Sequence, residues 1–136
     1  MVGGAGAKSL LGAGNTARIT NSGTLRVSST SSLQGNDAAF IQNTAGGLIE
    51  FLAQGGLGTL GSAQPSVLEN AGTVRFASGT TVPVTGWQVT NTGTISVQSG
   101  LFAWSGTNAS FGQTEGRLEL VGGNMSNQQH LSLSGG

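Results

Sequence analysis

The chain has 136 residues, of which 25 are glycine and only 7% are charged, and its formal net charge is zero. The basic residues are few and scattered, and no window approaches the ~20 apolar residues of a membrane span, so the composition argues against a nucleic-acid binder and a transmembrane segment. There is no cysteine, which excludes disulfides and thiolate metal sites, and nothing in the sequence implies a cofactor.

Residues 1–18 are rich in glycine and alanine, with an apolar run too short for a good signal peptide, and are expected to form a linker or an N-terminal cap. The folded part is expected to span residues 19–136. Both the glycine-rich opening and the final LSLSGG look like cuts through a longer array, or like ends that stack on another copy.

A short phrase recurs through this folded part. It reads NSGTLRV at 21–27, NAGTVRF at 70–76 and NTGTISV at 91–97, with looser copies GLIEF at 47–51 and GRLEL at 116–120. The anchoring glycines are Gly23, Gly47, Gly72, Gly93 and Gly116, spaced by 24, 25, 21 and 23 residues. A period in this range is typical of a solenoid, in which each repeat forms one turn and buries its apolar side on its neighbours.

Aligning the copies on glycine produces two apolar columns two residues apart, which is the period of a β-strand. The first column is Leu25, Ile49, Val74, Ile95 and Leu118. The second column is Val27, Phe51, Phe76, Val97 and Leu120. Both columns are expected to line the interior, whereas the residues between them should face outward: Arg26, Glu50, Arg75, Ser96 and Glu119. Stacking would make Arg26, Glu50 and Arg75 neighbours of alternating sign.

Asn21, Asn70 and Asn91 share the position two residues before the glycine. Asparagine tolerates the left-handed bend that a corner requires, and stacked asparagines can form an amide ladder along the axis. On this alignment, Ala45 and Thr114 interrupt the column. A structural role is therefore expected for these asparagines.

The phrase N-x-G-T-Φ-x-Φ, where Φ is apolar, followed by glycine-rich turns, resembles the parallel β-helix repeats of large bacterial surface proteins. Autotransporter passengers, filamentous-haemagglutinin-like adhesins and pectate-lyase-like solenoids are the groups it is similar to. The resemblance covers about residues 19–133 and implies an all-β, right-handed parallel β-helix (β-solenoid) of about five coils. Such proteins include adhesins, stalks, lyases and hydrolases, so the resemblance is specific for architecture rather than function.

The acidic residues do not form a catalytic pattern. Hydrolysis of sugars uses paired carboxylates on one face, and this chain has only Asp37, Glu50, Glu69, Glu115 and Glu119, spread over the repeats. GGLGT at 55–59 lacks the aspartate of a calcium-binding glycine repeat. We therefore expect no catalytic residue, no metal site and no enzymatic activity.

The tryptophans Trp87 and Trp104 leave two interpretations open. They could fill the core, or they could be exposed and stack on sugar rings, as a glycan-binding adhesin would require. The absence of tyrosine weakens the second interpretation.

The favoured hypothesis is a structural segment of an extracellular or cell-surface bacterial protein or fibre, with possible self-association of its end coils. Low charge, absence of cysteine and abundant Ser, Thr, Asn and Gly suit such a location. The first alternative is an adhesin module that binds a glycan or another cell-surface ligand through its tryptophans. The second alternative is a lyase-like or hydrolase-like β-helix without clear catalytic residues.

Overall fold

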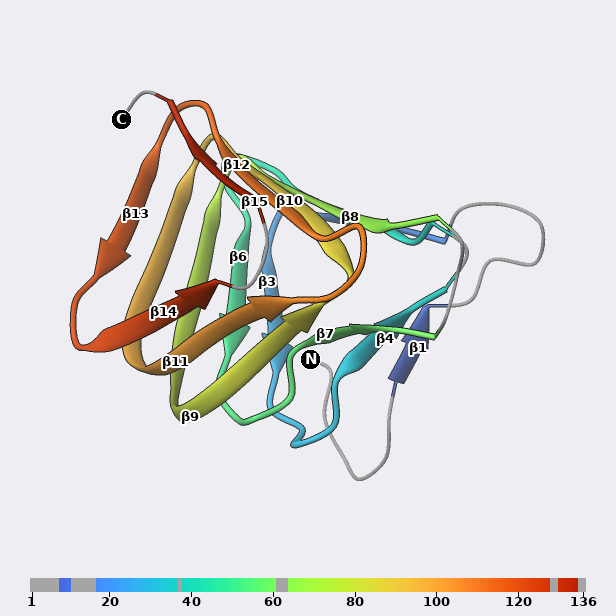
Figure 1. The fold of residues 1–136 in the computed structure, drawn as a ribbon, viewed down its shortest axis with the longest axis horizontal. Helices are drawn as coiled ribbons and strands as arrows, with labels where there is room; N and C mark the ends of the chain where they lie inside the picture. The colour runs from blue at the N-terminus through green and yellow to red at the C-terminus, as the bar shows by residue number, and fades with distance from the viewer. Residues whose placement is uncertain (1–7, 11–16, 37, 61–63, 128–129, 135–136) are drawn as a thin grey trace.

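The computed structural model describes residues 8–10, 17–36, 38–60, 64–127 and 130–134. In these residues every regular element is a β-strand, and every pair of neighbouring strands is parallel. The strands wind into about five stacked coils, which confirms the predicted all-β solenoid (Figure 1).

Each coil contributes strands to three faces. The first face contains β2 (Arg18–Asn21), β5 (Phe40–Asn43), β8 (Ser66–Asn70), β10 (Trp87–Asn91), β12 (Ser110–Gln113) and β15 (His130–Leu133). The second face contains β3 (Thr24–Val27), β6 (Leu48–Phe51), the first parts of β9 (Thr73–Thr85) and β11 (Thr94–Ser105), and β13 (Arg117–Leu120). The third face contains β1 (Lys8–Leu10), β4 (Leu33–Gly35), β7 (Leu57–Thr59), the later parts of β9 and β11, and β14 (Gly123–Asn127).

The long strands β9 and β11 bend from the second face to the third. They pair with each other on both sides of the bend, and their register shifts near it. This continuity joins the two faces into one nine-stranded sheet, while the first face remains a separate six-stranded sheet (Figure 1). In the stretch expected to be a linker or cap, β1 pairs with β4 on the third face, and residues 1–7 and 11–16 lie outside the described residues.

The two predicted apolar columns are present in the predicted register. Leu25 pairs with Ile49, and the alignment continues through Val74, Ile95 and Leu118. The second column runs in the same way from Val27 to Leu120. In the middle coils both columns are buried, and Phe51 and Phe76 stack there with ring centroids 4.9 Å apart.

The end coils differ from this pattern. Leu25 and Leu118 are only partly buried, and Leu120 is 53% exposed. The prediction that Leu120 lies in the interior is therefore wrong. Its strand has the expected register, but no further coil stacks on that strand within the described residues, so nothing there removes its side chain from water.

The charged column between the apolar ones is also in register, but Glu50 in this column is not exposed. Arg26 Nε donates to Glu50 Oε2 at 2.6 Å from the preceding coil, and Arg75 pairs with Glu50 from the following coil. The Glu50 side chain is only 4% exposed, whereas the Arg26 side chain is 51% exposed. The predicted neighbours of alternating sign are therefore present, but Glu50 is buried rather than exposed, because the two guanidinium groups cover its carboxylate.

Replacing Glu50 with glutamine should lower the free energy of unfolding by about 1–2 kcal/mol, because two partly desolvated guanidinium groups lose their shared counter-charge. The matched variant Glu119→Gln should change it by less than about 0.5 kcal/mol, because its partner Arg117 has a 73% exposed side chain. Urea titrations of both variants measure the difference, and equal losses would contradict the importance of burial at Glu50.

Candidate functional site

An amide ladder follows one corner of the solenoid, where the first face turns into the second. The first four rungs, Asn21, Asn43, Asn70 and Asn91, are the last residues of their strands, and Gln113 takes the fifth place. All five side chains are buried. The structure thus places the three predicted asparagines in one column, and it adds two rungs that the glycine alignment did not find.

The ladder bonds run along the axis. Asn21 Nδ2 donates to Asn43 Oδ1, Asn43 Nδ2 to Asn70 Oδ1, and Asn70 Nδ2 to Asn91 Oδ1, each at 2.7 Å. The same nitrogens donate to backbone carbonyls of the corner, for example from Asn43 to Thr73 O at 3.1 Å. The last bond, from Asn91 to Gln113 Oε1, is longer at 3.4 Å. The ladder therefore satisfies polar groups that the tight corner buries.

The ladder corrects two sequence predictions. Ala45 does not interrupt the column, because Asn43 fills that coil, and Gln113 rather than Thr114 fills the last one. The asparagines also do not supply left-handed backbone, because among the described non-glycine residues only Ala38 and Asn108 have positive φ. Counting from the strand before the corner, instead of from the glycine after it, aligns RITN, FIQN and VLEN and would have identified Asn43.

Trp87 and Trp104 both lie in the core and are 0% exposed. The Trp87 indole donates to Gly58 O at 2.9 Å, and the Trp104 ring packs edge-on against Phe111 with centroids 5.7 Å apart. The interpretation in which they stack on a glycan is therefore wrong, because neither ring presents a face to solvent.

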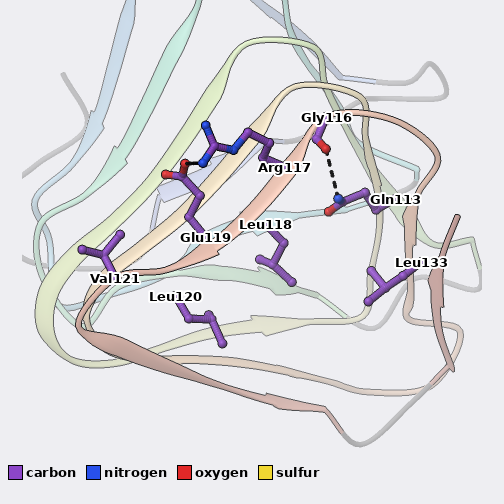
Figure 2. Close-up of a pocket in the computed structure, with 8 residues that line it drawn as sticks. All are labelled: Gln113, Gly116, Arg117, Leu118, Glu119, Leu120, Val121 and Leu133. Atoms are coloured by element: carbon purple, nitrogen blue, oxygen red, sulfur yellow. Dashed lines mark hydrogen bonds and ion pairs between the residues drawn. The ribbon is translucent and has the colours of Figure 1, made fainter. Parts of the chain in front are cut away.

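The C-terminal end of the solenoid exposes several apolar side chains. Leu118 and Leu120 on β13 and Leu133 on β15 point toward one another across this end, around a hollow of about 660 Å³ (Figure 2). Leu120 is 53%, Val121 71% and Leu133 57% exposed. Within the described residues, β13 pairs only with β11 and β15 only with β12, so each leaves one strand edge without a neighbour.

Leucine replaces an amide at this end. Leu133 is the register partner of Gln113, so it occupies the place where the next rung of the ladder would stand. Gln113 instead donates to Gly116 O at 3.3 Å. The charged pair Arg117 and Glu119, at 2.7 Å, lies on the other side of β13 from these leucines (Figure 2). The side of this end that holds the leucines is therefore apolar, and the Arg117–Glu119 pair at its border carries no net charge.

The carboxylates do not gather into a reactive group. Glu50, Glu69 and Glu119 lie on different coils, Glu115 lies in a turn, and Asp37 lies outside the described residues. No cluster of three or more His, Cys, Asp or Glu occurs among the residues that the structure describes. In the same part of the chain, no helix is long and apolar enough to cross a bilayer.

Comparisons of the chain with models of protein families, with curated proteins and with solved structures find no match. The resemblance to bacterial surface β-helices therefore depends on the repeat phrase and on the solenoid architecture, and the open C-terminal end is the candidate site that follows from the geometry alone.

Proposed function

We propose that this chain is a rigid structural segment of an extracellular bacterial surface protein or fibre, with no enzymatic role, that extends by stacking head to tail. The observation that carries this proposal is the C-terminal end face, where Leu120, Val121 and Leu133 are exposed beside unpaired strand edges. Unpaired edges of this kind are templates for a further strand, and a head-to-tail contact that does not close produces a filament.

The partner is the N-terminal coil of a second copy. In the described residues, β2 pairs only with β5 and β3 only with β6, so the first and second faces also have open edges at that end. Ile19 and Leu25 are partly buried there, and Leu25 belongs to the same interior row as Leu118 at the other end. Because all strands run parallel, stacking one copy on another would continue this row in the same direction.

The amino-acid composition supports a location outside the cell. Only 7% of the residues are charged, and Ser, Thr, Asn and Gly are abundant, a mix that suits an extracellular bacterial protein. The repeat phrase is also similar to that of bacterial surface β-helices, which is why we place it outside the cell.

Replacing Leu120 with glutamate should weaken self-association by at least about tenfold, because stacking would then bury a carboxylate without a partner. Sedimentation velocity over a concentration series measures this effect. The wild-type chain should show an average mass that increases with concentration, and the variant should remain close to the monomer.

Leu52→Glu is the matched control, because Leu52 is 42% exposed but follows β6 in the second coil, away from both ends. This variant should associate like the wild type. A wild-type chain that stays monomeric at every concentration, or a Leu52 variant impaired as strongly as the Leu120 variant, would refute end-to-end stacking.

A further inference from the structure

A second hollow lies on the outside of the solenoid, at the corner marked by the amide ladder. It has a volume of about 330 Å³, at the lower end of the usual range for small-molecule sites. Its lining includes Gln42, Thr44 and Ala45 from one coil, Glu69 and Ala71 from the next, and Thr90 from the one after. It is separate from the hollow at the C-terminal end, which is lined by Gln113, residues 116–121 and Leu133.

This groove lies beside the longest of the turns at this corner. Residues 44–47 connect β5 to β6, whereas the corresponding turns of the next two coils are only residues 71–72 and 92–93. Thr44 is held in place by donating its hydroxyl to Asn21 O at 3.1 Å, and Ala45 beside it is exposed. In solenoids, an insertion into one repeat forms a loop on the surface, which is often the binding surface.

The groove offers donors and acceptors in a row along the axis. Gln42, Glu69 and Thr90 are register partners on three successive strands, so they are spaced by roughly 4.8 Å. Arg18 Nη2 donates to Gln42 Oε1 at 2.8 Å, which leaves the amide nitrogen of Gln42 to donate. Glu69 is exposed and forms no ion pair in the described part of the chain. Its carboxylate is therefore able to accept hydrogen bonds from a ligand.

Two opposite charges lie near this row. The guanidinium of Arg18 borders it beside Gln42, and the carboxylate of Glu69 lies at its centre, so together they favour neither a cation nor an anion by net charge. A neutral ligand with paired hydroxyl groups fits this arrangement, because hydroxyls donate to Glu69 and accept from Gln42. The exposed methyl groups of Ala45 and Ala71 provide a small apolar surface for the C–H face of a ring.

We propose that this groove binds a neutral saccharide, with Glu69 accepting hydrogen bonds from two adjacent hydroxyls and Gln42 and Thr90 holding the flanking ones. No aromatic ring lines the groove, so stacking adds nothing and the affinity for a single sugar is weak.

Saturation-transfer NMR on the full chain with glucose, galactose, mannose and N-acetylglucosamine tests this proposal. At least one of these sugars should bind, and Glu69→Ala should weaken its binding about tenfold, as expected for loss of hydrogen bonds to a charged group. Glu115→Gln removes an exposed carboxylate outside the groove and should bind like the wild type.

Protonated glucosamine and glucuronate serve as the charged probes, and both should bind more weakly than the neutral sugars. Failure of all four neutral sugars to bind, or equal loss in the Glu69 and Glu115 variants, would overturn the proposal. Preferential binding of glucosamine would also overturn it, because the groove would then be a cation site.

Discussion

Replacing Asn70 with alanine should lower the free energy of unfolding by about 3–4 kcal/mol, because Asn70 is the central rung of the amide ladder and is 1% exposed. Its Oδ1 accepts from Asn43 at 2.7 Å, and its Nδ2 donates to Asn91 Oδ1 at 2.7 Å and to Thr94 O at 3.1 Å. Truncation leaves Asn91 Oδ1 without its donor, removes the shortest of the bonds that Asn43 Nδ2 donates, and leaves a cavity in the corner. A buried polar group that loses its partner costs about 1–3 kcal/mol, and the cavity and the weakened Asn43 contact add to this. Urea unfolding followed by the fluorescence of the two buried tryptophans measures the loss.

Gln113→Ala is the matched control at the end of the same ladder. Gln113 accepts one long bond of 3.4 Å from Asn91, and the next residue in its column is Leu133. Its truncation should cost only about 1 kcal/mol, because fewer buried groups lose a partner. Equal losses in the two variants would mean that the ladder is not a cooperative stabilising element but a row of independent polar contacts.

The architecture could be predicted because one pattern recurs with nearly constant spacing. A single alignment of five glycines placed Leu25, Ile49 and their equivalents in one column, and the strand pairing has that register throughout. In a solenoid each coil contacts mainly its neighbours, so a correct local register determines the global arrangement.

The individual environments could not be predicted in the same way, because they depend on what lies above and below each residue. Glu50 is buried since both neighbouring coils supply an arginine, and Leu120 is exposed since no described coil follows its strand. The alternation of strand side chains assigns a face to each residue, but it does not say whether that face is covered.

The candidate sites arise where the repeat is irregular, and for that reason the alignment did not reveal them. The longer turn after Asn43 displaced the glycine from its usual distance, which hid the second rung of the ladder, and this turn also lies beside the outer groove. Trp87 lies on the strand before the corner, outside the aligned phrase, so the alignment could not assign its side chain to the interior. The residue that accepts its indole hydrogen bond, Gly58, comes from another coil.

Replacing Gly93 with alanine should lower the free energy of unfolding by about 3 kcal/mol, because the corner glycines stack on one another's carbonyl groups. A methyl group on Gly93 would lie under 3.0 Å from Gly72 O and from the backbone of Ala71. The Gly72 carbonyl cannot move aside without losing the hydrogen bond that it accepts from Thr94 N at 2.8 Å. Relief of this overlap therefore requires the two coils to separate at the corner.

Gly23→Ala makes the same substitution in the same phrase and is the matched control. No atom lies within 4 Å of the position that its Cβ would occupy, and its φ is not in the left-handed region. The change should therefore be within about 0.5 kcal/mol of zero, or slightly stabilising through the unfolded chain. Urea unfolding of the two variants side by side separates steric stacking from the flexibility of glycine. If both substitutions destabilise equally, the corner requires glycine for its backbone conformation, and the close contact between coils is not the cause.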